Sequence, residues 1–390
     1  MNLRAVLSLC ALGFLLRLTY SLATGSDAPF PDELRFLEEG ESLLSGTGLQ
    51  ANGKYGHDMP MTGLVVAAGL YISGGSIMGV KLIMAVLSTV TIFLVARLCF
   101  SICQDNRATL LAAFICAIYP FFIFYSARVL SETIFLFFMT LFFWLLFDKS
   151  KSPLSRGVAA GLMHLTKPIF FYLLPLIWIW QYLVQKMSLK NVLLGVLTTL
   201  VVASPWVIRN HLIFDDLVVN TASSGHILWE GNNPWNKTGG VSGTFEDPVA
   251  WLAVVPEGLS ELEEDEWKKA EAIAFIKSHP IAFVENGVRK LKRFWNLWPN
   301  SANHQGWIYK LISLGSFGPV LLLSMIGAIL LKQYRKELLL MLGVAAYLSA
   351  LHAVILGSIR YRLPLEPLMI VVASMTLADL RKKQKAPLTT

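Results

Sequence analysis

Long apolar blocks separated by short basic segments dominate this sequence and limit what it can fold into. Of its 390 residues, 55% are hydrophobic and only 15% are charged, whereas soluble domains carry about 25% charged residues. Several blocks are long enough to enter or cross a bilayer as helices. Basic residues gather in the short connections, as is typical of cytoplasmic loops. The sequence therefore predicts an all-α polytopic membrane protein, and the net charge of +7 needs no nucleic-acid partner.

The alternation of apolar blocks and basic loops predicts about ten crossings, with both termini in the cytoplasm. Residues 5–23 are interpreted as a retained helix, because Arg17 interrupts the block and no good signal-peptide cleavage site follows. Residues 157–184 would give about 42 Å of helix, whereas two full crossings need about 60 Å, so they are expected to form a short pair with Lys167 at its tip. The other expected crossings are residues 77–100, 108–124, 133–147, 191–207, 311–331, 338–357 and 363–380.

One membrane domain, residues 1–390, is predicted, and its first extracytoplasmic loop is residues 24–58. This loop is rich in acids and contains a short stretch near residues 34–44 whose apolar positions fit an amphipathic helix at the membrane surface. Residues 59–72 are apolar but too short to cross, so an interfacial or re-entrant helix is expected there.

A second, much larger extracytoplasmic loop is predicted over residues 208–309. Residues 261–278 favour a helix that Pro280 ends. From Val284 to Trp298, apolar residues recur at helical spacing with basic residues between them. This pattern predicts a basic amphipathic helix suited to an anionic outer leaflet, so membrane lipids are expected partners.

Most polar residues that could carry chemistry fall on the outer side. No Gly-rich phosphate loop lies on the cytoplasmic side, so a substrate would reach the outer side through the membrane. A lipid-linked phosphate donor fits, because its phosphate needs Arg or Lys and an attacking hydroxyl needs a carboxylate base. The outer residues are Asp32, Glu33, Arg35, His57, Asp58, Arg128, Glu132, Lys167, Arg209, Asn210, Asn232, Asn233, Arg360 and Arg362.

An ordered set of short motifs gives a family resemblance over nearly the whole chain. The motifs are PDELR, YPFFIFYSARVLSE, GLMHLTKP, SPWVIRN, GNNP and RYRLPLEP. Together they resemble the GT-C glycosyltransferases, the superfamily of protein O-mannosyltransferases and lipid A aminoarabinose transferases, including a bacterial, glycosyltransferase 39-like branch. The resemblance implies an inverting transferase that takes a hexosyl or pentosyl group from a polyprenyl-phosphate donor. It also implies a multi-pass protein of the cell (inner) membrane with its active site facing the periplasm or exterior.

The resemblance assigns catalytic roles to three acids. Asp32, the first acid of the outer-loop motif, is implied to be the base or its positioner, and Glu33 is its neighbour. Glu132 closes the LSE stretch and is expected to face the same cavity. The alternatives are that Asp32 and Glu33 merely solvate a loop, and that Glu132 pairs with Arg128 four residues earlier.

Five basic residues are expected to bind the donor phosphate. The resemblance implies this role for Arg35 and for Lys167, which stands where the family often has Arg and lacks its two-pronged geometry. The family often has a basic residue followed by two prolines where this chain has HDMP, which makes His57 a further candidate. Arg360 and Arg362 are candidates because basic residues on the outer side run against the orientation rule.

Several functions remain open at this stage. The acceptor can be an envelope glycan, a lipid or a protein, and no cofactor is required, although two or three carboxylates could hold a divalent metal. An O-antigen polymerase or ligase also combines many crossings with one large outer loop, but the acidic pair in the first loop argues against it. A transporter would place its charges near the middle of the membrane and often shows repeats, which this sequence does not.

Overall fold

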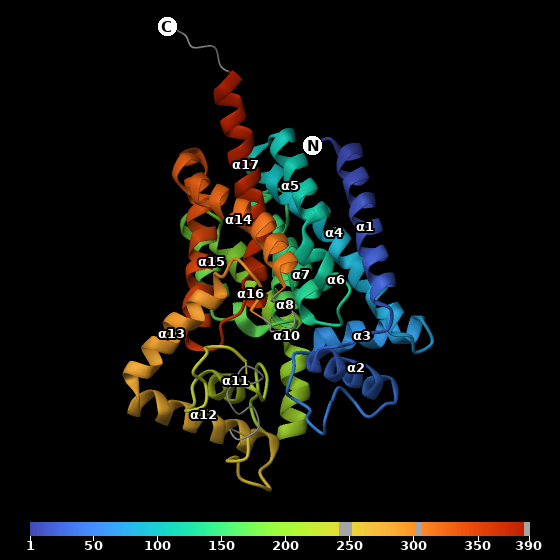
Figure 1. The fold of residues 1–390 in the computed structure, drawn as a ribbon, viewed down its shortest axis with the longest axis vertical. Helices are drawn as coiled ribbons and strands as arrows, with labels where there is room; N and C mark the ends of the chain where they lie inside the picture. Colours follow the sequence, from blue (N-terminus) through green and yellow to red (C-terminus); the bar gives the residue numbers. More distant parts are fainter. Residues whose placement is uncertain (242–251, 301–305, 386–390) are drawn as a thin grey trace.

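The computed structural model describes residues 1–241, 252–300 and 306–385, and this part of the chain is almost entirely helical, with one isolated β-bridge between Ala51 and Lys54. Figure 1 shows a helical bundle in which the start of α1 and the end of α17 lie at one end, while α2, α3, α11 and α12 lie at the other. The helices are α1 (Leu3–Thr24), α2 (Pro31–Leu44), α3 (Pro60–Ile72), α4 (Ile77–Cys103), α5 (Asn106–Ile118), α6 (Pro120–Ser126), α7 (Ser131–Phe147), α8 (Pro153–His164), η1 (Pro168–Phe170), α9 (Leu174–Leu183), α10 (Leu189–Phe214), α11 (Ser224–Gly231), α12 (Glu261–Ser278), α13 (Pro280–Phe294), α14 (Trp307–Leu330), η4 (Lys332–Tyr334), α15 (Arg335–Val354), α16 (Ile359–Arg362), η5 (Leu363–Leu365) and α17 (Glu366–Lys385).

Six of the described helices are long and apolar enough to cross a membrane, namely α1, α4, α10, α14, α15 and α17. The bent pair α5 and α6, with 51° between its two parts, would make a seventh. The apolar helices α3, α7 and α9 are shorter, so the predicted count of about ten crossings is not confirmed. These findings describe a multi-pass membrane protein, and the short pair expected over residues 157–184 is present as α8, η1 and α9.

The core of the bundle is built around α4 and α17. Helix α4 packs against α1, α5 and α7, and α17 packs against α5 and α14. Their shared interior buries aromatic and aliphatic side chains, with Phe142 and Phe143 from α7 and Val371 from α17 fully buried. Leu193, Leu197 and Leu200 instead form an exposed apolar stripe along α10. That stripe is what a lipid-facing helix surface requires.

Arg17 is fully buried inside the bundle despite lying in the first apolar block. Its guanidinium donates hydrogen bonds to the Ser88 hydroxyl at 2.7 Å and to the carbonyls of Gly13, Cys116 and Ala117 at 2.9–3.1 Å. Because each of these bonds joins α1 to itself, to α4 or to α5, the charge is satisfied by neighbouring helices. This explains how an apolar helix tolerates an arginine at its middle.

The segment between α11 and α14 contains the two expected helices, α12 and α13. Helix α13 does not present all its basic residues to the surface. Helix α12 begins with a capping box at Ser260 and Glu263. Helix α13 exposes the apolar residues Ile281, Val284 and Val288. Lys290 on the same helix is fully buried, and its ammonium donates to the Val354 carbonyl at 2.8 Å and to Asn232. The described face of α13 is therefore apolar outward, with one of its cations turned into the protein.

Candidate active site

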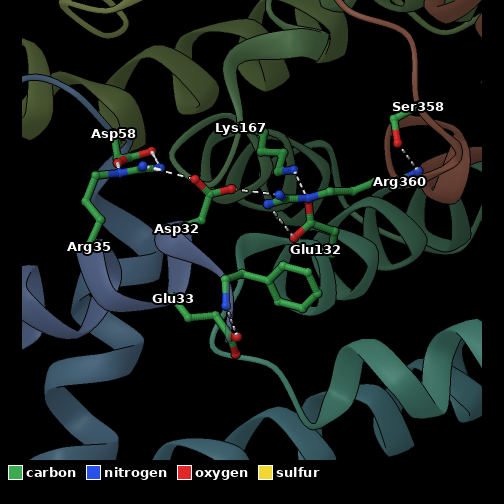
Figure 2. A network of polar contacts seen from close by, with 9 residues as sticks. Asp32, Glu33, Arg35, Asp58, Glu132, Lys167, Ser358 and Arg360 are labelled. Atoms are coloured by element: carbon green, nitrogen blue, oxygen red, sulfur yellow. Dashed lines mark hydrogen bonds and ion pairs between the residues drawn. The ribbon is translucent and has the colours of Figure 1, made fainter. Parts of the chain in front are cut away.

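Six charged side chains form a continuous series of ion pairs (Figure 2). In spatial order they are Asp58, Arg35, Asp32, Arg360, Glu132 and Lys167. Acids and bases alternate along this series, which is called the charge network below. Each member has a partner of opposite sign on at least one side, so the network can exist in a partly buried place.

Asp32 and Arg360 occupy the centre of the charge network. Arg360 Nη1 lies 2.7 Å from Asp32 Oδ2, and Arg35 Nη1 lies 3.0 Å from Asp32 Oδ1. Arg360 also donates two hydrogen bonds to Glu132, from Nε to Oε1 at 2.6 Å and from Nη2 to Oε2 at 3.2 Å. Lys167 Nζ approaches Glu132 Oε1 to 2.7 Å. Arg35 bridges Asp32 to Asp58, whose Oδ2 is 2.5 Å from Arg35 Nε.

These side chains come from segments far apart in the sequence. Asp32 and Arg35 are three positions apart on α2, so they share one helix face. Glu132 lies in the first turn of α7, and Lys167 immediately precedes η1 at the tip of the short helical pair. Arg360 belongs to the short helix α16, which precedes α17. These elements therefore bring the side chains of the charge network together at one place.

Access to solvent differs sharply between the two acids beside Arg360. The Asp32 side chain is 33% exposed, whereas that of Glu132 is 2% exposed. Burial by itself raises the pKa of Asp32, but the charges and hydrogen bonds of Arg360 and Arg35 outweigh this and hold it well below its usual range. Asp32 is consequently a charged and accessible carboxylate at neutral pH. The oxygens of Glu132 are engaged by Arg360 and Lys167, and those of Asp32 by Arg35 and Arg360, so the two acids differ in exposure and not in pairing.

Glu33, although adjacent to Asp32, lies outside the charge network. Its Oε1 accepts a hydrogen bond from the Val129 backbone N–H at 2.8 Å, and its Oε2 accepts one from Phe30 at 3.2 Å. The Phe30 bond closes the first turn of α2, while the Val129 bond ties α2 to the loop before α7. Glu33 thus connects the helix that carries Asp32 to the one that carries Glu132.

We expect Glu33→Gln to lower stability more than it alters chemistry. An amide offers only one acceptor oxygen, so one of the two backbone N–H groups would lose its partner, at a cost of about 1–3 kcal/mol. The thermal unfolding midpoint in detergent should fall, and it can be followed by tryptophan fluorescence. An unchanged midpoint together with a large loss of activity would instead give Glu33 the catalytic role that the sequence suggested.

Arg362 also points away from the charge network. Its Nε lies 3.0 Å from Glu366 Oε1, and its Nη1 donates to the carbonyls of Asn296 and Phe294 at 2.6 and 3.3 Å. The guanidinium is fully buried over the Phe317 ring, 3.3 Å from its centroid. Successive helical residues are rotated by about 100°. Arg360 and Arg362 therefore project in different directions, and only Arg360 reaches the acids.

The region around Asp58 contains residues of two kinds. His57 packs edge-on against His226, with ring centroids 5.9 Å apart, and burial lowers the pKa of His57, which favours its neutral form. Its side chain is thus less suited to binding phosphate than a permanent cation. Behind Asp58, burial and the negative charge of Asp58 raise the pKa of Glu39 to about 9, so Glu39 is protonated at neutral pH.

Arg128 does not form the local pair with Glu132 that was considered from their spacing. Its guanidinium lies over the rings of Phe124 and Phe30, at 4.9 and 5.6 Å from their centroids. Glu132 is held by Arg360 and Lys167 instead. Asp58 is the network member that sequence reasoning left without a role. Its only signal was its place beside His57 in the HDMP stretch, because its partner Arg35 lies 23 residues away.

The described residues contain no group of three His, Cys, Asp or Glu side chains placed to hold a metal ion. The acids of the charge network are separated from one another by Arg35 and Arg360. As arranged, these residues do not fit a divalent ion, and no step below is routed through one.

Comparison with solved structures connects this architecture to known proteins. The archaeal oligosaccharyltransferase AglB from Archaeoglobus fulgidus, in complex with an inhibitory peptide and a dolichol-phosphate, matches 97% of this chain with a TM-score of 0.53 and 16% identity. The Archaeoglobus fulgidus oligosaccharyltransferase in complex with Zn and sulfate matches 96% with a TM-score of 0.52 and 16% identity. The chain shares the fold of these two oligosaccharyltransferases. It covers 50% and 49% of those two chains, so it spans about half their length.

Two further comparisons match a shorter stretch of the chain or show a weaker likeness. The family model for dolichyl-phosphate-mannose-protein mannosyltransferase matches residues 57–208, a region that includes Asp58, Glu132 and Lys167. ArnT from Cupriavidus metallidurans, bound to undecaprenyl phosphate, aligns over 100% of this chain and 82% of its own, with 14% identity and a TM-score of 0.48. No curated protein matches the sequence.

Proposed function

We propose that the chain transfers a glycosyl group, with inversion, from a polyprenyl-phosphate donor to an acceptor hydroxyl at the outer end of the bundle. The observation that carries this proposal is the accessible Asp32 carboxylate, held between Arg35 and Arg360 in the charge network. The matched family is named for a dolichyl-phosphate sugar, and the AglB structure contains a dolichol-phosphate. Both support a lipid-linked phosphate donor.

A single displacement accounts for the residues of the charge network. The acceptor hydroxyl oxygen attacks the anomeric carbon, a new C–O bond forms, and the bond from that carbon to the phosphate oxygen breaks with its electron pair. The hydroxyl proton moves to Asp32, and the polyprenyl phosphate leaves with one additional negative charge. Attack opposite the leaving group inverts the anomeric centre. A positioned base of this kind contributes about 10²–10⁴-fold in rate.

The cations of the charge network are proposed to stabilise the departing phosphate. Arg360 and Lys167 converge on Glu132, whose side chain is nearly inaccessible. Glu132 is proposed to position these two cations, leaving them available to a phosphate that approaches from the exposed side. Stabilisation of the departing phosphate by fixed cations is a large electrostatic contribution. Arg35, which is paired with Asp58 and Asp32, is the third cation of the charge network.

Lys167 offers a test within this scheme. Lys167→Gln should reduce the rate of donor consumption by about ten-fold, since one charge-assisted phosphate contact worth roughly 1.5–3 kcal/mol is partly replaced by Arg360. Lys167→Arg should retain most activity because it restores the charge. The measurement is steady-state consumption of donor by purified variants. Equal loss in both variants would mean that packing at this position, rather than its charge, limits the reaction.

The decisive experiment for the function uses the purified chain in nanodiscs with labelled polyprenyl-phosphate sugars. We expect loss of at least one hexosyl or pentosyl donor, release of polyprenyl phosphate, and an inverted anomeric configuration by NMR. Mass spectrometry of envelope glycans with and without the gene would identify the acceptor. A chain that consumes none of these donors but moves a solute across the bilayer would favour the transporter. Lengthening of a glycan by repeat units would favour the polymerase.

A further inference from the structure

An aromatic pocket lies on the outer segment, apart from the charge network. Its volume is about 360 Å³ and it lies between α11 and α12, with walls that include Trp229, Trp235, Trp267, Glu271 and Phe275. Figure 1 shows α11 and α12 at the same end of the molecule as α2 and α3. We propose that this pocket binds a pyranose ring of an acceptor glycan. The inference rests on the proposed glycosyl transfer and names the class of its acceptor.

The walls of the pocket match the two-sided chemistry of a sugar ring. The ring centroids of Trp229 and Trp235 are 6.1 Å apart, with 80° between the ring planes. Those of Trp229 and Trp267 are 6.0 Å apart, with 73° between the planes. The indoles therefore form walls at steep angles to each other instead of a closed stack. A pyranose presents C–H bonds on one face, which pack on flat aromatic rings, and hydroxyls around its edge. Pockets of a few hundred Å³ with mostly aromatic walls and few polar groups suit small ligands.

A carboxylate stands among the aromatic walls. Glu271 lines the pocket and offers acceptor oxygens to the hydroxyls at the edge of a sugar ring. A purely aliphatic lipid chain would give this carboxylate no hydrogen bond, and Glu271 would repel an anionic head group.

The end of α11 is fixed to the segment that leads to Arg360. The backbone at Gly231 packs so closely on Ile355 that an added Cβ would lie 2.1 Å from its carbonyl oxygen. The Asn232 amide donates to the Val354 carbonyl at 2.9 Å. A glycan bound beside Trp229 would therefore lie against α11, and the end of α11 packs tightly on the segment that precedes α16. Helix α16 carries Arg360, the central cation of the charge network. This arrangement suits an acceptor with one sugar bound remotely and another presented for transfer.

Saturation-transfer NMR on the full chain in nanodiscs tests the proposal. The probe is a mixture of oligosaccharides released by mild acid from the envelope of the host, compared with the same mixture after periodate has opened its sugar rings. We expect signals on ring C–H protons from the untreated mixture alone. Trp235→Ala should weaken binding by about ten-fold, as expected for one aromatic contact. Glu271→Gln keeps the shape of the pocket and should weaken binding several-fold.

A matched tryptophan outside the pocket serves as the control. Trp298 is exposed, so Trp298→Ala should bind the mixture like the unaltered chain. Equal binding of the treated and untreated mixtures, no binding of either, or no loss in both pocket variants would overturn the proposal. Displacement of the sugars by an unglycosylated peptide would also overturn it in favour of a protein acceptor. Donor consumption by the unaltered chain tests the glycosyl transfer separately, so each idea can fail alone.

Discussion

Asp32→Asn is expected to lower glycosyl transfer by about 10²–10⁴-fold, the usual contribution of a positioned base. The amide matches the carboxylate in shape but cannot take the hydroxyl proton. Arg35 and Arg360 hold the pKa of Asp32 below its usual range, so it is unprotonated when the acceptor arrives. Engagement of these two cations by the donor phosphate would raise its basicity. The rate should be measured as transfer from labelled donor at saturating donor and acceptor, with the unfolding midpoint recorded in parallel.

Asp58→Asn is the matched control for Asp32→Asn. It removes the same charge from the other side of Arg35, but Asp58 does not contact Arg360 in the described network. We expect a loss of about ten-fold or less, because only the orientation of Arg35 is affected. Equal losses in the two variants would indicate that overall charge balance, and not the position of Asp32, sets the rate. Near-normal transfer by Asp32→Asn would remove Asp32 from the mechanism.

Local sequence signals were sufficient for most helices. The apolar blocks predicted α1, α4, α10 and α14, and Pro280 marked the end of the helix predicted over residues 261–278, which is α12. The short pair with Lys167 at its tip followed from length alone. Each of these features depends on residues close together in the chain. The number of true crossings also depends on contacts between distant residues, because α3, α7 and α9 are short apolar helices whose placement depends on their neighbours.

The detailed choice among site residues depended on contacts that the sequence does not contain. Asp32 and Glu33 are adjacent and chemically similar. Glu33, however, accepts a hydrogen bond from the backbone N–H of Val129, 96 residues away, and therefore lies outside the charge network. Arg360 and Arg362 were equivalent as outer-side cations. A rotation of about 200° over two helical positions separates them, and the carbonyl of Asn296 fixes which of them is buried.

Arg360→Ala is expected to reduce donor consumption by about 10²–10³-fold, comparable to the loss of one fixed donor that stabilises a developing negative charge. Arg360 contacts both Asp32 and Glu132, so its removal also leaves Glu132 buried with Lys167 alone, and some loss of stability should accompany the change. Arg360→Lys should recover only part of the rate, because an ammonium cannot hold two oxygens in the planar geometry of a guanidinium. The loss should appear both as weaker donor binding and as a lower rate at saturating donor, because Arg360 is proposed to contact the phosphate before and during its departure, with the acceptor requirement little changed.

Two further arginine variants separate this role from a general effect of charge. Arg289 is a largely exposed arginine of α13 paired with Glu285, and Arg289→Ala should leave donor binding unchanged. Arg362→Lys alters a buried arginine of the same short helix as Arg360 and should chiefly lower the unfolding midpoint, since its partners are Glu366 and backbone carbonyls. If Arg362→Lys weakens donor binding as much as Arg360→Lys, the phosphate interacts with the other side of α16. If Arg360→Ala raises only the acceptor requirement, Arg360 belongs to the acceptor side, and the phosphate must be held by Arg35 and Lys167.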